Sequence, residues 1–205
     1  MLSKIDDIDL QVVTLQKHCE ELGDFPSDET LVAIKNLYLC AIQEAERIKK
    51  SPQDIYTIAI SVRNLFEINM ISLYLKRSDE IINQWYGQLL KDVLDVQEGL
   101  ILLFSKHGVH NSNLELAREQ TINSGLRNGV AKSKPFNIKS IAKKLGWEED
   151  YDAIYKLCSK IVHPSSVKVN LPNAFEKNDE YIGSLVHVAI HYMYLIVEGA
   201  KHKSV

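Results

Sequence analysis

The sequence predicts an all-α fold, and three of its properties carry that prediction. Pro and Gly are scarce, with 5 and 9 among 205 residues, so few turns interrupt the chain. Long segments repeat apolar residues every three or four positions, which is the period of an amphipathic helix and not of a strand. The apolar and charged fractions, 45% and 25%, are ordinary for a globular protein, and a chain of this length can bury a core without staples.

The first two helices are expected over residues 4–22 and from residue 27 or 28 to about residue 50. Pro26 lies between them and interrupts the helical pattern. Ser27 and Asp28 are alternative N-caps of the second helix, because both side chains can accept a hydrogen bond from the first turn. The expected core positions are Ile5, Ile8, Val12, Leu15 and Leu22 in the first helix, and Leu31, Ile34, Tyr38, Ala41, Ala45 and Ile48 in the second.

A third helix is expected from Ser51 to about Arg77. Ser51 is the predicted N-cap and Pro52 the first helical residue, a position that proline favours. The segment from Ile55 to Leu75 is apolar around most of its circumference, so we expect this helix to be largely buried.

A long fourth helix is expected over residues 78–106, and Gly108 ends it. A shorter helix is expected over residues 113–124, ending before Gly125. Residues 125–136, which contain Gly125, Gly129, Ser133 and Pro135, are expected to form a loop.

The next helix is short, with Asn137 as its N-cap and Gly146 at its end. A further helix starts at about Tyr151 and ends at His163, because Pro164 pushes the residue before it out of the helical region. His163 is therefore expected at or just past the helix C-terminus, where the helix dipole favours an imidazolium.

Residues 164–176 look irregular, and the last helix is expected to begin at Asn178 or Asp179. Two apolar strips run along it, so it is expected to be central in the bundle or to pair with another subunit. The first strip contains Tyr181, Leu185, Val188, Tyr192 and Leu195, and the second Ile182, Val186, Ala189 and Ile196.

The cysteines argue against a disulfide scaffold or a zinc ribbon. Cys19, Cys40 and Cys158 are odd in number, far apart and without a CxxC pair, as is typical of a reducing cytoplasm. The N-terminus shows no signal-peptide pattern. The most apolar run, residues 185–197, is too short to span a bilayer. We therefore expect a cytoplasmic protein without a membrane segment and without a cofactor.

The charge is uneven along the chain. Residues 120–147 contain six basic and no acidic side chains, within a protein of net charge −3. An isolated basic segment argues against a general nucleic-acid coat and permits a local anion site, although such a run is more often a solvated face. Phe136 and Trp147 flank it and could stack on bases. The basic side chains are Arg127, Lys132, Lys134, Lys139, Lys143 and Lys144.

Arg63 and Glu67 lie one helical turn apart in the apolar third helix. The ordinary explanation is a structural ion pair, because buried charges are normally paired. The functional alternative is that Glu67 orients Arg63 toward a phosphate, which a guanidinium binds in a planar, bidentate manner.

His163 likewise has a structural and a chemical explanation. It can cap carbonyl groups at the helix end, or it can act as a general acid or base near neutral pH. Tyr155, Ser159 and His163 are spaced four apart, so they lie on one stripe of their helix. A Ser159–His163 nucleophile pair is conceivable, but the sequence has no GxSxG elbow.

His187 and His191 are also four apart, a spacing that can hold a metal. The intervening sequence, HVAIH, lacks the glutamate of HExxH, so we expect no metal site. A histidine pair in a helix core or an interface is the favoured interpretation.

Three segments together resemble a bacterial all-helical family with HEPN-like architecture. They are VRNLFE at Val62–Glu67, IKSIAKKLG at Ile138–Gly146, and the pattern YxxxYxxxSxxxHPSS at Tyr151–Ser166. The resemblance covers roughly residues 50–200. It implies that residues 1–49 form an N-terminal helical extension and residues 50–205 an HEPN-like helical bundle.

The resemblance further implies a homodimer, and many HEPN-like domains are metal-independent endoribonucleases of toxin–antitoxin or phage-defence systems. In those enzymes an Arg four to six residues before the His stabilises the phosphorane. This sequence departs from that pattern, since no Arg lies within six residues before His163. A lysine (Lys160 or Lys156) substitutes, or Arg63 supplies the guanidinium from another helix, or the activity is absent.

Two functional hypotheses follow. The first is an RNA-cleaving protein with His163 as acid or base, Arg63 as phosphate clamp and Glu67 as its orienting partner. The second is a non-catalytic module that binds nucleotide, RNA or protein through a buried Arg63–Glu67–His163 network. Expected partners are a second copy, RNA and an operon-encoded protein. The expected substrate-binding residues are Ser159, Lys160, Tyr155, Lys143 and Lys144.

Overall fold

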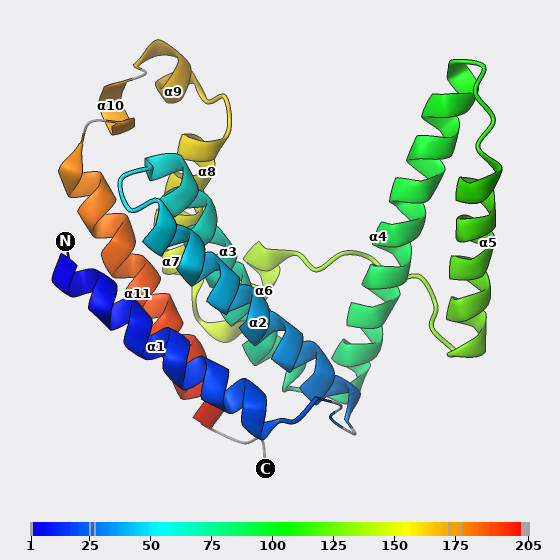
Figure 1. Cartoon of the computed structure of the whole chain (residues 1–205), viewed down its shortest axis with the longest axis horizontal. Helices are drawn as coiled ribbons and strands as arrows, with labels where there is room; N and C mark the ends of the chain where they lie inside the picture. The colour runs from blue at the N-terminus through cyan, green and yellow to red at the C-terminus, as the bar shows by residue number, and fades with distance from the viewer. Residues whose placement is uncertain (1, 25, 27, 172, 177, 202–205) are drawn as a thin grey trace. The chain divides into compact units, whose positions relative to one another are not determined.

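The computed structural model describes residues 2–24, 26, 28–171, 173–176 and 178–201, and within these residues it contains helices and no strand. The predicted all-α fold is therefore confirmed. In chain order the elements are α1 (Leu2–Glu21), α2 (Glu29–Lys50), α3 (Ile55–Leu75), α4 (Asp79–Lys106), α5 (Ser112–Arg127), α6 (Ile138–Leu145), α7 (Glu148–Asp150), the π-helical turn η1 (Tyr151–Tyr155), α8 (Lys156–Val162), α9 (Ser166–Asn170), α10 (Asn173–Glu176) and α11 (Asp179–Lys201) (Figure 1).

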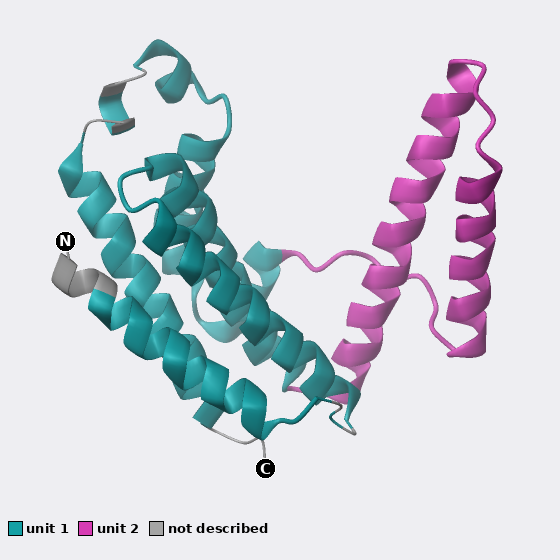
Figure 2. Cartoon of the chain, viewed as in Figure 1, with its two compact units in different colours: residues 1–76, 138–205 teal, residues 77–137 magenta. Residues whose placement is uncertain are grey.

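The chain divides into two compact units (Figure 2). Unit 1 contains residues 1–76 and 138–205, and unit 2 contains residues 77–137. The predicted boundary at residue 49 does not coincide with this division, because α1 and α2 pack in unit 1 together with α3 and α11. Unit 2 is a helical hairpin in which α4 packs against α5.

Helix α3 is the centre of unit 1. It packs against α2, α11, α8 and α6, and its buried residues lie on most of its circumference, as predicted. Helix α11 packs on both α3 and α1 through one side, while its other side, with His187 and His191, is exposed. The histidine pair, predicted in a helix core or an interface, is therefore not in the core of this chain and lies at its surface.

Helices α3 and α11 are also long and apolar enough to cross a membrane by length and composition. In α3, 72% of that apolar segment is buried inside the protein, and in α11 44% is buried. A core helix of a soluble protein can be equally long and apolar. In α3 the apolar side chains are buried by packing against the other helices of unit 1.

Several helix ends follow the predicted caps. The Asp28 carboxylate accepts hydrogen bonds from the backbone N–H groups of Thr30 (2.6 Å) and Leu31 (3.2 Å). At the start of α11, Asn178 Oδ1 accepts from Glu180 and Tyr181 in the same way. Ser27 and the side chain of Ile5 lie outside the described residues.

The predicted start of α3 is wrong. Ser51 closes α2 instead, because its N–H donates to the carbonyls of Arg47 (3.1 Å) and Ile48 (3.3 Å). The N-cap of α3 is Asp54, whose carboxylate accepts from Tyr56 N (3.0 Å). An aspartate three residues downstream thus outcompetes the Ser-Pro signal.

Two further predictions about turns are wrong. Helix α5 continues past Gly125 to Arg127. Gly125 does not end the helix; it allows Leu90 to pack closely, since a Cβ there would lie 2.8 Å from Leu90 Cδ2. The left-handed residue that ends α5 is Gly129, at φ 65°. Residues 164–176, predicted to be irregular, contain α9 and α10.

A buried polar network joins α2 to α3. The Glu44 side chain is only 8% exposed, and its carboxylate accepts hydrogen bonds from Ser61 Oγ (2.9 Å), Asn64 Nδ2 (2.9 Å) and Arg47 (2.6 Å). Three donors offset the cost of burying this charge. The network fixes the register between the two helices.

Asn69, also in α3, is buried without such compensation. It is 1% exposed, and among the described residues neither Nδ2 nor Oδ1 has a hydrogen-bond partner. We expect Asn69→Leu to raise the free energy of unfolding by about 1–3 kcal/mol, because it removes a polar amide that is buried without hydrogen bonds. Urea unfolding measures the change. Asn64→Leu is the matched control and should destabilise the protein; destabilisation by Asn69→Leu would contradict the prediction.

Candidate functional site

Arg63 and Glu67 form the predicted pair on α3. Arg63 Nε donates to Glu67 Oε1 over 3.2 Å, and the two side chains are 27% and 28% exposed. Burial opposes the charge of Arg63, but the neighbouring Tyr155 and Glu67 outweigh burial and raise its pKa. The guanidinium is thus fixed, charged and open to solvent.

His163 follows the end of α8 as predicted. Its backbone is extended (φ −89°, ψ 159°), and its N–H donates to the Ser159 carbonyl over 3.1 Å. The imidazole is exposed, and its Nε2 lies 3.2 Å from Arg63 Nη1. Because a guanidinium only donates, Nε2 must accept, and the ring proton is assigned to Nδ1. The Nε2 lone pair is therefore engaged by the Arg63 cation, and the Nδ1 proton is left on the other side of the ring.

Tyr155 completes the site from the π-helical turn. Its hydroxyl oxygen accepts from Arg63 Nη2 over 2.7 Å, and the guanidinium carbon lies 4.6 Å from the ring centroid. Burial raises the pKa of the Tyr155 phenol and Glu67 raises it further, while Arg63 opposes the shift. π-helical turns are frequent at functional sites, and this one places Tyr151 and Tyr155 in a stack with centroids 4.7 Å apart.

An aromatic cluster supports the site from below. Phe66 is fully buried, and its ring centroid lies 6.0 Å from Tyr155, 6.4 Å from Tyr151 and 5.5 Å from Tyr192. Burial raises the pKa of the nearby Cys158 thiol to about 12, against the opposing effect of Arg63, so Cys158 stays an unreactive thiol. The site therefore offers no cysteine nucleophile.

Ser159 and Lys160, also predicted at the site, lie along α8. Within the described residues the Ser159 hydroxyl makes no hydrogen bond to His163; only its carbonyl accepts from the His163 backbone. A Ser–His nucleophile pair is therefore not formed. Lys160 is exposed, and its carbonyl accepts from Ser165 Oγ over 2.8 Å. The cation beside His163 is the guanidinium of Arg63 and not the ammonium of a lysine.

The basic segment of residues 120–147 is divided between the two units. Arg127, Lys132 and Lys134 belong to unit 2, and the other three lysines to unit 1. Lys143 is exposed, whereas Lys144 Nζ donates to the Tyr74 hydroxyl over 2.9 Å and lies 5.1 Å from that ring's centroid.

A second lysine–tyrosine pair lies near the other end of α3, and the sequence did not predict it. Lys168 Nζ lies 4.1 Å from the centroid of the Tyr56 ring. Tyr56 and Tyr74 are 18 residues apart, which is five turns at about 3.6 residues per turn, so they share one face of α3. Arg63 and Glu67 lie on the same face, and we call these four residues the α3 stripe.

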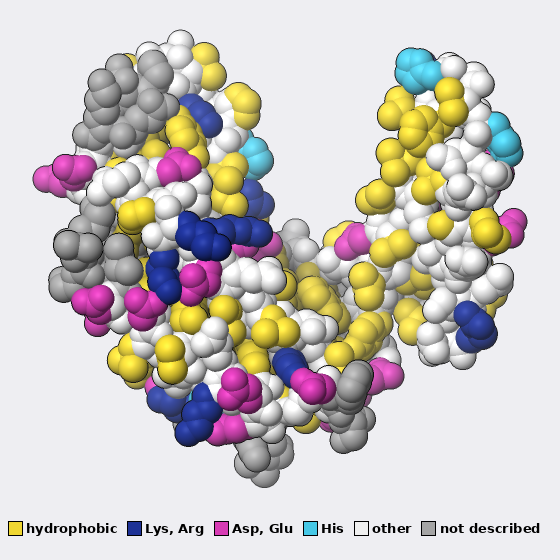
Figure 3. All heavy atoms as spheres, in the orientation of Figure 1, with side chains coloured by type: hydrophobic (Ala, Val, Ile, Leu, Met, Phe, Trp, Pro, Cys, Tyr) yellow, Lys and Arg dark blue, Asp and Glu magenta, His cyan; other side chains and the backbone are white. Residues whose placement is uncertain are grey.

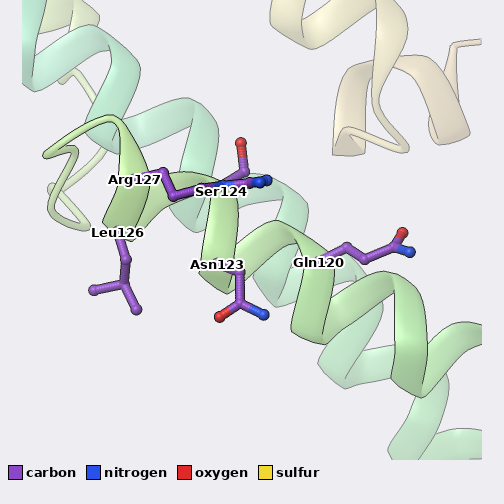
Figure 4. A pocket seen from close by; sticks show the side chains of 5 residues that line it. All are labelled: Gln120, Asn123, Ser124, Leu126 and Arg127. Atoms are coloured by element: carbon purple, nitrogen blue, oxygen red, sulfur yellow. The ribbon is translucent and has the colours of Figure 1, made fainter.

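Other features are less promising as sites. A search of the described residues finds no cluster of three or more His, Cys, Asp or Glu side chains that could hold a metal. An open hollow on unit 2 is lined by residues of α5 and its end (Figure 4), and its side chains extend from one helix surface without converging. They are Gln120, Asn123, Ser124, Leu126 and Arg127.

Comparisons with known proteins complete the description of the site. No curated protein and no solved structure matches the chain. One protein family, described as a family of unknown function, matches residues 53–181. The matched region begins before α3 and ends within α11, so it contains Arg63, Glu67, Tyr155 and His163. The chain belongs to this family, DUF5677.

Proposed function

We propose that the protein is a metal-independent endoribonuclease of HEPN-like architecture that acts in a bacterial toxin–antitoxin or phage-defence system in the cytoplasm. The observation that carries the proposal is the 3.2 Å contact between Arg63 Nη1 and His163 Nε2 at the surface. An arginine from α3 supplies the guanidinium that is missing from the helix of His163 itself.

The chemistry requires a base, an electrostatic clamp and an acid. When Arg63 Nη1 releases its hydrogen bond to Nε2 and turns to the phosphate, His163 Nε2 takes the proton of a ribose 2′-hydroxyl, and the 2′-oxygen attacks the adjacent phosphorus. Arg63 stabilises the negative charge that develops on the phosphorane. The 5′-oxygen leaves with a proton from the Tyr155 phenol, since a tyrosine is protonated at neutral pH. The products are a 2′,3′-cyclic phosphate and a 5′-hydroxyl.

Arg63 retains the donors that this role needs. A guanidinium has five N–H groups, and one each goes to Glu67, His163 and Tyr155. One N–H therefore remains on each terminal nitrogen and can donate to a phosphate oxygen. Glu67 and Tyr155 hold the guanidinium in place for that contact.

The α3 stripe supports a polymeric anion as the substrate. Along the helix Tyr56 lies about 10 Å and Tyr74 about 16 Å from Arg63, on opposite sides of it. Each tyrosine is accompanied by a lysine, Lys168 or Lys144. Cations beside aromatic rings bind single-stranded nucleic acid through phosphate contacts and base stacking. Lysine–tyrosine pairs of this kind therefore lie on both sides of the Arg63–His163 pair along the direction of α3.

The proposal is tested by incubating the purified protein with total RNA and with a single-stranded RNA oligonucleotide in EDTA. We expect cleavage that leaves 2′,3′-cyclic phosphate ends, because the 2′-hydroxyl is the nucleophile. An oligonucleotide with 2′-deoxyribose at every position is the control and should stay intact. Intact RNA, or equal cleavage of the 2′-deoxy control oligonucleotide, would contradict the proposal.

A second proposal is a non-catalytic module that binds RNA, a nucleotide or a protein. The observation in its favour is that all three nitrogens of the Arg63 guanidinium already have partners. This network is not fully buried, because Arg63 and Glu67 are partly exposed and His163 is exposed. The module predicts that His163→Ala lowers the melting temperature by several degrees without changing any nucleolytic assay.

A further inference from the structure

Helix α4 of unit 2 exposes a regular row of apolar side chains. Leu89, Val93, Val96, Leu100 and Leu103 follow one another at spacings of four, three, four and three residues. Their exposed fractions are 54%, 37%, 63%, 39% and 50%. We call this row the α4 seam, and Figure 3 shows hydrophobic side chains on the surface of the hairpin.

The α4 seam is not the face that packs against α5. That face contains Leu94, which is 1% exposed, and Gln97, whose Nε2 donates to Thr121 Oγ1 over 3.1 Å. It also contains Glu98, which pairs with Arg118 over 3.0 Å. Helix α4 therefore has two distinct faces: one packs against α5, and the other, the α4 seam, is exposed.

The spacing of the seam specifies what can cover it. Apolar residues that alternate at four and three positions are the a and d positions of a coiled coil, which pack against a helix of the same pattern. Among the described residues, no helix other than α4 exposes more than two large apolar side chains. The matching surface on this chain is thus another α4.

We propose that two copies of the protein associate through their α4 seams. The five seam residues expose roughly 400 Å² of apolar surface, which is in the range of the largest apolar patch on a monomeric protein, and such a patch often has a function. Two facing seams would remove roughly 800 Å² from water, and flanking residues bring the total toward the ~1,200 Å² at which stable interfaces begin. The area therefore suits a dimer.

Gly99 provides a second reason. It lies inside α4 beside the seam, where glycine is unfavourable for a helix, and a Cβ added there would meet nothing within 4 Å in this chain. Packing within the chain therefore does not require a glycine at this position. A residue without a side chain beside an apolar seam lets a neighbouring helix approach closely.

The oligomeric state of the full chain tests the proposal. We expect light scattering to give twice the 23.3 kDa chain mass for the wild type, and a single chain mass for Val96→Lys. The matched control is Leu102→Lys, which lies on α4 away from the seam at 72% exposure and should stay dimeric. Val96 is 63% exposed in the single chain, so the lysine is tolerated by the fold, and circular dichroism checks that both variants keep their helix content.

Leu103→Ser provides a second, uncharged variant of the seam and should weaken the dimer in the same way. A wild type that is monomeric across a dilution series would overturn the proposal, and so would dimers that persist in both Val96→Lys and Leu103→Ser. Dissociation of Leu102→Lys alone would place the interface on a different face of α4. The result does not depend on whether the protein cleaves RNA.

Discussion

His163→Ala is expected to lower the rate of RNA cleavage by about a hundredfold to ten-thousandfold, the range typical of removing a general base. The imidazole is exposed and borders solvent, so its removal leaves no buried cavity. Initial rates on a single-stranded RNA oligonucleotide in EDTA measure the loss. Retention of the wild-type rate by His163→Ala would contradict the assigned role.

The matched control for this variant is His191→Ala. His191 is also an exposed histidine, but it lies on α11, where its ring neighbours Tyr192 rather than Arg63. We expect His191→Ala to keep the wild-type cleavage rate. We also expect both variants to keep the wild-type melting temperature, which separates a catalytic role from the loss of several degrees that the non-catalytic module predicts for His163→Ala.

The largest effect on stability is expected from Phe66→Ala, at about 3–5 kcal/mol in the free energy of unfolding. Phe66 is fully buried at the junction of α3, η1 and α11, where it contacts the rings of Tyr151, Tyr155 and Tyr192. Removing the ring leaves a cavity among three aromatic side chains that cannot all move to fill it.

Urea unfolding followed by circular dichroism measures this loss, and Tyr194→Ala is the control, since Tyr194 is an aromatic residue that is 47% exposed on α11. The control should change stability by less than about 1 kcal/mol. We also expect Phe66→Ala to impair cleavage under conditions where it is folded, because Tyr155 rests on Phe66. A loss of stability no larger than that of Tyr194→Ala would show that the cluster does not support the site.

The fold was largely predictable because its determinants are local. The caps at Asp28 and Asn178 depend on side chains that bond to backbone groups two or three residues away, so the sequence limits each helix start to two neighbouring residues. The predicted helix boundaries were wrong where two capping residues competed, as with Ser51 and Asp54, or where a packing contact with a distant residue determined the structure. Gly125 belongs to the latter class, since Leu90 lies across the hairpin.

The site was predictable only in part for the same physical reason. The Arg63–Glu67 pair follows from a spacing of four on one helix. The contact between Arg63 and His163 joins residues 100 positions apart, and spacing alone left it as one of three alternatives. The bond from Arg63 to Tyr155 depends on the π-helical turn, for which the sequence carries no recognised signal.

The most direct test of the account compares cleavage rates of the wild type, Arg63→Ala, His163→Ala and the double variant on one RNA in EDTA. Groups that act on the same transition state have strongly non-additive effects. We expect the double variant to be about as slow as the slower single variant. Losses that multiply, or a wild type that leaves RNA intact, would contradict a joint catalytic role for Arg63 and His163.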